Sequence, residues 1–235
     1  MSGILFGVGV GPGDPELITL KARNILESAP VVAYPAPEEG ESFARIIAAP
    51  HIPVGRKEII IRTPMISGKF PAHDVYDHYA SVIEACLGAG QNVAVLCEGD
   101  PFLYGSFMYL FSRLSERHPV EVVPGVSSLG ACAAVAGVPL VSRNQVLTVV
   151  PGPLDEEELE SRITGSPAVA IMKVGRHFGK IFRILDRLNL LDNAQYVERA
   201  TMIEQRVMPL REVNIDSAPY FSMILVRQGE AEAGI

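Results

Sequence analysis

Short apolar runs rich in Val and Ile recur along this chain, and Gly, Pro or Asp follows each run within a few residues. Such runs are typical of buried strands in a parallel sheet, because helices cover both faces of such a sheet. Between several of them, apolar residues recur at three- and four-residue spacing, which indicates helices. The alternation predicts an α/β fold. The expected strands are residues 4–10, 31–34, 58–62, 92–97, 120–123, 146–150, 168–174 and 220–226.

The order of these segments predicts two domains. The strand, loop and helix units of the first part end near Val141, and a second series begins with "VLTVVPGP" at Val146. We therefore expect an N-terminal α/β domain over residues 1–142 and a C-terminal α/β domain over residues 143–235. Two strand-like runs near the end, "REVNI" and "PYFSMILV", suggest antiparallel pairing in the second domain.

The bulk composition argues against several classes of protein. Hydrophobic residues make up 48% of the 235 residues, as in ordinary globular proteins. The net charge of −7 argues against nucleic-acid binding, because no overall positive field would attract a phosphate backbone. No apolar stretch approaches the roughly 20 residues that span a bilayer, and no basic segment precedes the first apolar run. We therefore expect a cytoplasmic protein with neither nucleic-acid nor membrane partners.

The cysteines argue against a disulfide framework and against a metal site. Cys86, Cys97 and Cys132 are an odd number, lie far apart and have apolar neighbours, which is typical of reduced thiols in a core. None lies at metal-ligand spacing from another cysteine or from a histidine. The expectation is that the chain itself binds no metal.

Three glycine-rich loops follow expected strands: "GVGVGPGDPE", "LCEGDPFLYGS" and "VVPGVSSLG". Loops at the carboxyl ends of strands bind ligands in open α/β sheets, so three of them predict a site. In the first loop the last glycine of a dinucleotide fingerprint is replaced by Pro12, Asp14 or Glu16, depending on the register. These two acidic residues also occupy the region where a pyrophosphate would bind. A ligand without phosphate is therefore expected, and a nicotinamide-dependent enzyme is disfavoured.

The third loop is similar to a nucleophile elbow, but Leu129 stands where that motif needs its last glycine. A serine hydrolase therefore stays a distant alternative. Glycine and Asp-Pro pairs after strands are also ordinary turn chemistry, so any one of the loops taken alone is more simply explained as structural.

Four segments together resemble the tetrapyrrole methylase family: "VGVGPGDPELITLKA", "CEGDPFLYGSFMYL", "VPGVSS" and "ERAT". The similarity runs over essentially the whole chain, and "EGDPFLYGSFMYL" resembles the precorrin-2 C(20)-methyltransferase branch. The resemblance implies a homodimer of two-domain α/β chains that binds S-adenosylmethionine in a cleft between the domains. It also implies methyl transfer to carbon 20 of precorrin-2, or of its cobalt complex, in cobalamin biosynthesis. The donor carries no phosphate, in agreement with the loop chemistry.

The resemblance further implies which residues contact the donor. In the first domain these are Pro12, Glu98, Gly99, Asp100, Leu103, Tyr104, Ser127 and Ser128. In the second domain Met172, Ala200 and Ser222 would contact the adenine, largely through the backbone, with Lys173 or Val174 as alternatives to Met172. Residue type alone favours other roles: Asp100 and the two serines are also good helix caps, and Met172 is more often a core residue.

The implied acceptor carries many carboxylates, which calls for a local basic surface in an acidic protein. The candidates are Arg45, Arg62, Lys69, Lys173 and Arg176, with Arg56, Lys57 and His177 nearby in the sequence. For any single one of them, a solvated surface charge is the simpler explanation. No His-Asp pair or carboxylate pair identifies a general base, so Glu98 and Tyr104 are the residues to test.

Two other functions stay open from the sequence. One is a methylase of the same family that acts on another corrinoid position, on a protein residue or on ribosomal RNA, although the negative charge disfavours RNA. The other is a small-molecule binding module without catalysis. Turnover, as opposed to donor binding alone, separates the binding module from the carbon-20 methylase, and the segment "EGDPFLYGSFMYL" favours carbon 20 over the other methylases.

Overall fold

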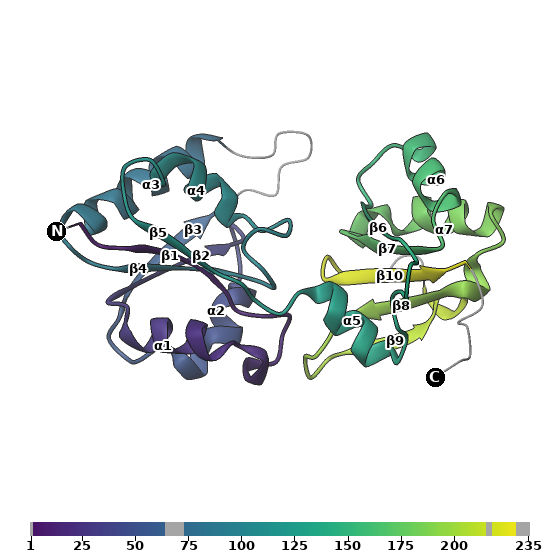
Figure 1. Ribbon diagram of the computed structural model, residues 1–235, viewed down its shortest axis with the longest axis horizontal. Coiled ribbons are helices and arrows are strands. Elements are labelled where there is room, and N and C mark those ends of the chain that lie inside the picture. Colours follow the sequence, from purple (N-terminus) through teal and green to yellow (C-terminus); the bar gives the residue numbers. More distant parts are fainter. Residues whose placement is uncertain (1, 64–72, 215–217, 229–235) are drawn as a thin grey trace. The chain divides into compact units, whose positions relative to one another are not determined.

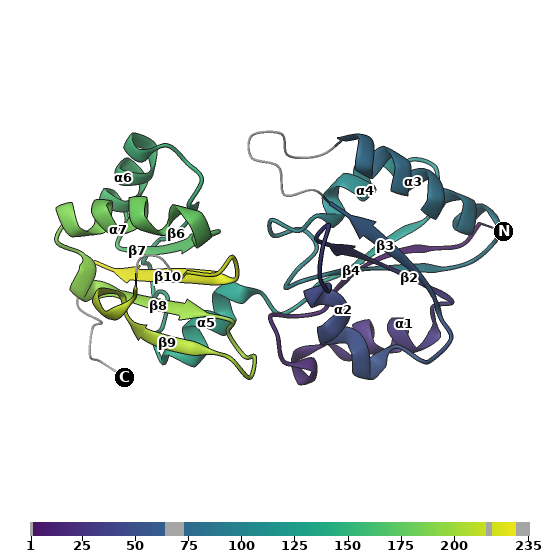
Figure 2. The same ribbon diagram turned by 180° about the vertical axis from the view of Figure 1, so that it is seen from behind.

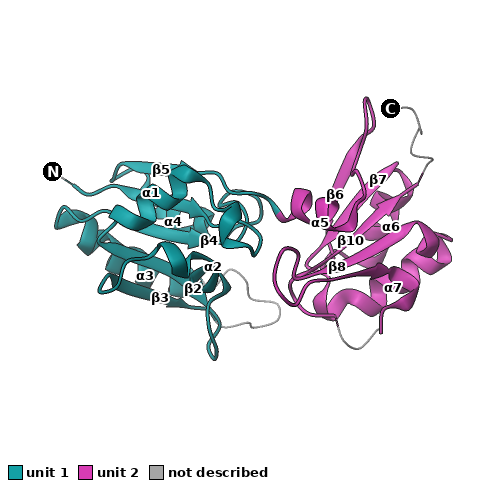
Figure 3. Ribbon diagram, turned by 90° about the horizontal axis from the view of Figure 1, so that it is seen from below, with its two compact units in different colours: residues 1–127 teal, residues 128–235 magenta. Residues whose placement is uncertain are grey.

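A computed structural model describes residues 2–63, 73–214 and 218–228. Its chain divides into two compact units, Met1–Ser127 and Ser128–Ile235, which Figure 3 shows in separate colours. Each unit contains one five-stranded sheet with helices on both faces. The α/β class expected from the sequence is therefore confirmed for both units.

Unit 1 is built on a fully parallel sheet with the strand order β3-β2-β4-β1-β5. Its strands are β1 (Leu5–Gly9), β2 (Val31–Ala36), β3 (Lys57–Arg62), β4 (Val93–Cys97) and β5 (Val120–Val123). Its α-helices are α1 (Leu20–Ser28), α2 (Phe43–Ala48), α3 (His73–Gly88) and α4 (Phe107–Leu114), and two short 3-10 helices are η1 (Pro15–Leu17) and η2 (Ala49–His51). Figure 1 shows α1 and α2 on one face of the sheet and α3 and α4 on the other.

Successive side chains along each strand point to opposite faces of this sheet, so each face has its own hydrophobic core. In β1, Phe6 and Val8 join the core under α1 and α2, whereas Leu5 joins the core under α3 and α4. Gly7 lies on the second face, where a Cβ would come within 2.4 Å of the Phe107 ring. Glycine at this position therefore lets α4 approach the sheet closely.

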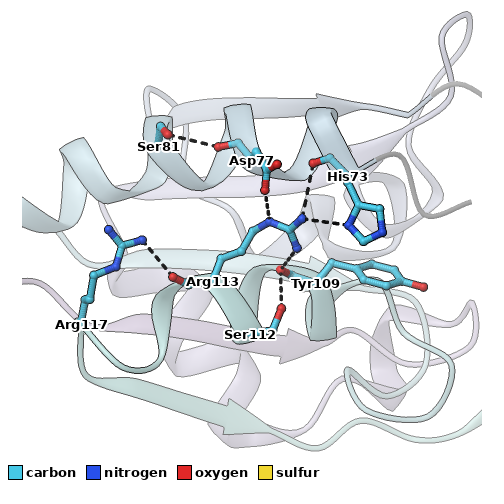
Figure 4. Close-up of polar contacts among 7 residues, drawn as sticks. All are labelled: His73, Asp77, Ser81, Tyr109, Ser112, Arg113 and Arg117. Carbon is cyan, nitrogen blue, oxygen red and sulfur yellow. Dashed lines mark hydrogen bonds and ion pairs between the residues drawn. The ribbon is translucent and has the colours of Figure 1, made fainter.

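Helices α3 and α4 are also joined by the guanidinium group of Arg113 (Figure 4). Its Nε donates to Asp77 Oδ1 at 2.6 Å, and its Nη1 donates to the Tyr109 carbonyl at 2.8 Å. The Nη2 atom donates to the His73 carbonyl at 3.4 Å. Because α4 follows the second glycine-rich loop directly, these contacts fix the helix on which that loop ends.

Unit 2 has a mixed sheet with the order β6-β7-β10-β8-β9. Its strands are β6 (Leu147–Pro151), β7 (Ala168–Met172), β8 (Ala194–Glu198), β9 (Arg206–Pro209) and β10 (Ser222–Arg227). Strands β6 and β7 pair in parallel, whereas β10 runs antiparallel to both β7 and β8, and β9 runs antiparallel to β8. Figure 2 shows β10 in the interior of the sheet.

The helices of unit 2 are α5 (Ser128–Ala136), α6 (Glu156–Thr164) and α7 (Phe178–Arg187), with the 3-10 helices η3 (Gly175–His177), η4 (Leu191–Asn193) and η5 (Leu210–Glu212). The larger core lies under α6 and α7 and includes Phe178, Ile184 and Ile224. A smaller core lies under α5 on the opposite face.

Two expectations from the sequence differ from the structure. The expected boundary lay after Ser142, but the compact units divide after Ser127, because Ala131 and Cys132 of α5 pack on Ala170 and Val197 of the second sheet. The run "REVNI" is not a strand over its described residues, since η5 occupies Leu210–Glu212. Antiparallel pairing in this domain is confirmed, but the partners are β10 with β7 and β8, and β8 with β9.

Candidate functional site

Unit 1 has a topological switch point between the neighbouring strands β1 and β4. The helix after β1 covers one face of the sheet, and the helix after β4 covers the other. Loops that leave adjacent strands toward opposite faces open a crevice at the carboxyl edge of a parallel sheet, where ligands of such folds bind. The first two glycine-rich loops begin at this point, and the third follows β5, the neighbour of β1 on its other side.

The three loops contact one another through their main chains. Gly11 and Gly99 form an isolated antiparallel bridge, in which Gly99 N donates to Gly11 O at 2.7 Å. A Cβ on Gly125 would lie 2.0 Å from Gly99 O, and one on Gly9 would lie 2.6 Å from Gly125 N. Both bridge glycines have positive φ, which L side chains rarely adopt. The glycines that the sequence singled out are therefore needed for the loops to meet.

Asp100 fastens the second loop to the third. Its Oδ1 accepts the Phe102 N–H at 2.9 Å, and its Oδ2 accepts the Gly125 N–H at 3.1 Å. The first bond is a local turn, whereas the second spans 25 residues of sequence. In this structure Asp100 thus shapes the site, and both of its oxygens are hydrogen-bonded.

Glu98 lies between the end of β4 and the start of α2. Glu98 is half-buried, and its Oε1 accepts the Ala44 N–H at 3.3 Å. Burial raises the pKa of Glu98, while hydrogen bonds from backbone N–H groups of Glu98 and Ala44 act in the opposite direction. The carboxyl therefore holds a proton more readily than an exposed glutamate.

The remaining predicted residues of unit 1 lie on the same edge. Leu103 and Tyr104 are 36% and 42% exposed, so the second loop presents apolar surface beside its main-chain groups. Pro12 follows the bridge glycine of the first loop, and Ser127 and Ser128 end the third loop where α5 begins. All three are half-buried.

The predicted residues of unit 2 also meet at one edge of their sheet. Because β10 is antiparallel to β7 and β8, its first residue lies beside the last residues of those strands. Ser222 is paired with Glu198, and Met172 with Met223, so the edge brings Met172, Ser222 and the turn after β8 together. Ala200 in that turn is buried, and the Ser222 hydroxyl donates to Pro219 O at 2.7 Å.

Unusual backbone conformations gather at these two edges. Among the described residues, positive φ at non-glycine positions occurs at Tyr104, Arg143, Lys173, Asn189, Arg199 and Thr201. Tyr104 lies in the second loop of unit 1, and Lys173, Arg199 and Thr201 lie in the turns after β7 and β8. Such conformations concentrate at ligand sites, where the surrounding structure maintains them.

A buried polar cluster that the sequence reasoning missed supports the edge of unit 2. Glu198 is 5% exposed, accepts the Tyr196 hydroxyl at 2.7 Å, and pairs with Arg206 Nη1 at 3.3 Å. Burial, followed by the hydrogen bond to Glu198, raises the pKa of Tyr196. Tyr196 and Glu198 share a face of β8 at a two-residue spacing, but the pairing with β9 that brings in Arg206 has no sequence signature.

The basic residues expected in unit 1 already have partners. Arg45 donates to both carboxylate oxygens of Glu58, at 3.0 and 2.9 Å, and Arg62 donates to the carbonyls of Pro37 and Gly40 at 2.7 and 3.0 Å. The Glu58 hydrogen bond is the largest cause of a raised pKa at Arg45. Lys69 lies outside the described residues.

Arg56 and Lys57 lie near the start of β3, whereas Arg62 ends the strand, so they do not form one cluster with it. Within the described ranges, no helix combines the length and the apolar character needed to cross a membrane, and no group of three or more His, Cys, Asp or Glu residues could hold a metal ion.

Comparison with known proteins identifies relatives of this chain. The family model of the tetrapyrrole (corrin/porphyrin) methylases matches residues 5–214. A precorrin-2 C(20)-methyltransferase from Sinorhizobium is 42% identical over 238 residues, which cover 96% of this chain and 97% of the relative. The cobalamin biosynthesis protein CobIJ of Mycobacterium bovis is 41% identical over 240 residues, which cover 98% of this chain and 47% of the relative. The chain thus spans about half the length of CobIJ.

A solved structure is similar over nearly the whole chain as well. The uroporphyrin-III C-methyltransferase of Thermus thermophilus, complexed with S-adenyl homocysteine, has a TM-score of 0.68 and 28% identity, and the match covers 95% of this chain and 97% of that chain. The matched model, the near full-length identity and the shared fold agree: the chain belongs to the tetrapyrrole (corrin/porphyrin) methylase family.

Proposed function

We propose that the chain transfers a methyl group from S-adenosylmethionine to carbon 20 of precorrin-2, or of its cobalt complex, in cobalamin biosynthesis. The observation that carries the proposal is the 42% identity to a precorrin-2 C(20)-methyltransferase across nearly the full length of both chains. The segment "EGDPFLYGSFMYL", which resembles this branch of the family, forms the second loop and the start of α4.

The edge of unit 1 fits a donor that carries no phosphate. Asp14 Oδ1 accepts the Glu16 N–H at 2.8 Å, so a carboxylate occupies the N-terminal turn that a phosphate would need. Leu103 and Tyr104 add apolar surface next to the loop amides. We assign the methionine end and the polar groups of the donor to Pro12, Glu98, Gly99, Asp100, Leu103, Tyr104, Ser127 and Ser128.

The edge of unit 2 fits backbone recognition of a flat, apolar base. The side chain of Ala200 is buried and the Ser222 hydroxyl already has an acceptor, so their main-chain groups are the available contacts. Met172 packs partly into the small core under α5. We assign the adenine to the backbone of Met172, Ala200 and Ser222.

When bound, S-adenosylmethionine supplies an electrophilic methyl group, so the chain needs no nucleophilic side chain. Its residues align donor and acceptor and exclude water, and such positioning supplies roughly 7 to 11 kcal/mol in favourable cases. The acceptor carbon also loses a proton. Glu98 suits this role better than Asp100, because burial raises the pKa of Glu98 and both oxygens of Asp100 are hydrogen-bonded within the loops.

The decisive experiment is anaerobic incubation of the purified protein with S-adenosylmethionine labelled with carbon-13 at the methyl group. Metal-free precorrin-2 and its cobalt complex are supplied separately, and carbon NMR locates the label. Label at carbon 20 establishes the function, and the preferred acceptor identifies the pathway variant. Label at another carbon assigns a different branch of the family. Donor binding without any transfer supports the binding module instead.

A Glu98→Gln variant tests the proton acceptor in the same assay. We expect kcat to fall by about a hundredfold, because general bases typically contribute at least that much. Donor affinity is measured separately, because Glu98 is also one of the proposed donor contacts. Unchanged kcat would remove Glu98 from this role. The homodimer and the cytoplasmic location stay predictions, and sedimentation equilibrium tests the first of them.

A further inference from the structure

Four basic residues surround the start of α7 in unit 2: Lys173, Arg176, His177 and Lys180. We call them the basic cluster. They lie in a stretch without acidic residues, since no Asp or Glu occurs between Glu160 and Asp186. In a chain with a net charge of −7, such a segregated group of positive charges calls for an explanation.

The position of the basic cluster opposes the electrostatics of its own helix. The N-terminal end of a helix is positive, so acidic residues stabilise it and basic residues destabilise it. Helix α6 follows this rule, because Asp155 caps it and its first turn holds three glutamates. Helix α7 breaks the rule: it has no acidic residue in its first turn, and its N-cap residue His177 makes no capping hydrogen bond through its side chain. The fold thus maintains a concentration of like charge.

The ionisable groups of the basic cluster respond to burial first and, at His177, to the neighbouring positive charges second. Arg176 Nε donates to His177 Nε2 at 3.3 Å, and because a guanidinium group can only donate, this imidazole is neutral. Burial, then Lys180 and Arg176, lower the pKa of His177, and burial lowers the pKa of Lys173. Lys180 Nζ donates to the Leu154 carbonyl. An anion placed here would relieve the repulsion among these groups.

The basic cluster also lies at the ligand edge of unit 2. Lys173 follows β7 directly and has a φ of 56°. A Cβ on Gly175 would lie 3.6 Å from the Cα of Tyr220. Tyr220 precedes β10, whose first residue, Ser222, is one of the proposed adenine contacts. Arg176 is exposed, and the other three members are half-buried, so a ligand can reach them.

We propose that the basic cluster binds carboxylate groups of a polycarboxylate acceptor. This inference rests on the proposed function for the identity of the acceptor. Arginine recognises a carboxylate with two parallel hydrogen bonds, and the neighbouring lysines add charge without a fixed geometry. Arg45 of unit 1, by contrast, is neutralised by its ion pair with Glu58.

The test is binding of a stable polycarboxylate macrocycle, uroporphyrin I, to the purified full chain, measured by fluorescence titration without any donor. Coproporphyrin I, which carries fewer carboxylates, serves as a weaker ligand, and a porphyrin with cationic substituents measures stacking alone. We expect binding to weaken from the first to the second, to be absent for the third, and to weaken with added salt. Equal binding of all three would overturn the proposal.

Variants then locate the site. Arg176→Gln and Lys180→Gln should each weaken uroporphyrin binding by about tenfold, the loss expected for one charge-assisted hydrogen bond. The matched control is Arg183→Gln, because Arg183 is exposed on α7, about 10 Å beyond Arg176 of η3, and should leave binding unchanged. Circular dichroism melts confirm that each variant folds. An equal loss in the control would reduce the effect to general charge and overturn the assignment.

A second measurement separates the two carboxylate sources, the acceptor and the methionine end of the donor. Affinity for S-adenosylhomocysteine should stay the same in the Arg176 and Lys180 variants, and a parallel loss of that affinity would move the site to the donor. Because uroporphyrin binding needs neither donor nor turnover, it can succeed even if carbon-20 transfer fails. Failure of the basic cluster and failure of the proposed function are therefore distinguishable.

Discussion

The two sheet edges that carry the predicted site residues are stabilised by different kinds of contact. In unit 1 the loops after β1, β4 and β5 touch through their main chains, and glycines make the contact possible. In unit 2 the turns after β7 and β8 are supported by side chains, above all by the buried Glu198 with its tyrosine and arginine partners. At the first edge, the space between main chains limits which side chains are tolerated. At the second edge, charge and hydrogen bonding limit them. Substitutions at the two edges should therefore fail in different ways.

The largest effect is expected from Gly125→Ala. The new methyl group would lie 2.0 Å from Gly99 O, an atom of the main chain, so the second and third loops must separate. We expect a loss of about 3 kcal/mol of stability, near the top of the usual range for overpacking, together with a loss of donor binding. Urea unfolding and titration with S-adenosylhomocysteine measure the two.

Gly130→Ala is the matched control for this substitution. Gly130 lies within α5, and a Cβ there would have no atom within 4 Å. This variant should gain roughly 0.5 to 1 kcal/mol, because alanine favours the helix. If Gly125→Ala were as stable as the wild type, the loops of unit 1 would not depend on main-chain contact.

The second effect concerns the side-chain support of unit 2. Glu198→Ala removes the acceptor of the buried Tyr196 hydroxyl and the partner of Arg206, so we expect a loss of about 2 kcal/mol. Glu198→Gln keeps the volume and an acceptor oxygen and should lose less. The difference between the two variants in urea unfolding is the measurement. Equal losses would mean that packing volume, and not hydrogen bonding, supports this edge.

A third variant tests a side-chain cluster in unit 1. Glu58 accepts bonds from Arg45 and Tyr34, and the hydrogen bond with Arg45 is the largest cause of its lowered pKa. A carboxyl with a lowered pKa stabilises the fold at neutral pH, and this stability is lost as the pH falls through its folded pKa. Because the cluster is partly exposed, Glu58→Gln should remove only about 1 kcal/mol at pH 7 and should flatten the acid limb of the stability profile.

The smallest effect is expected from His177 of the basic cluster. Here burial and neighbouring like charges shift the pKa, whereas a partner of opposite charge shifts that of Glu58. The pKa of His177 is lowered from its ordinary 6.5 by burial and then by Lys180 and Arg176. The unfolded chain therefore binds the proton more readily, so stability is lost as the pH falls from about 6.5 to the folded pKa. His177→Gln should remove this weak dependence near pH 6, which urea unfolding between pH 5 and pH 7 would detect. An unchanged profile would mean that the imidazole is not electrostatically stressed.

The parts of the fold that could be predicted from sequence are those with a local signal. The apolar runs located β1 and β4, and the glycine-rich loops after them do lie together at one edge. Helix α5 was assigned to the wrong side of the boundary because its segment is apolar all round, so no amphipathic face indicates which sheet it covers. Strands β8 and β9 were not expected, because Gln195 and Glu198 interrupt the first and Arg206 begins the second, so neither forms a continuous apolar run.

The site shows the same division. The loop residues of unit 1 lie in short continuous motifs, so the sequence alone identifies them. The partners of Arg45 and Arg62 come from other segments of the chain, so they depend on how those segments pack. The contact of Glu198 with Arg206 likewise requires the register of β8 and β9. Local chemistry is readable before folding, but pairing across elements is not.

The place of β10 within its sheet has a consequence for synthesis on the ribosome. Unit 1 is complete when residue 127 has been made, whereas unit 2 needs Ser222–Arg227, because this late strand separates β7 from β8. At the usual rate of elongation, the second sheet waits about 5 to 20 s after the first is finished. During that interval the edges of β7 and β8 that will pair with β10 stay unpaired, which makes nascent unit 2 the part of the molecule most in need of a chaperone.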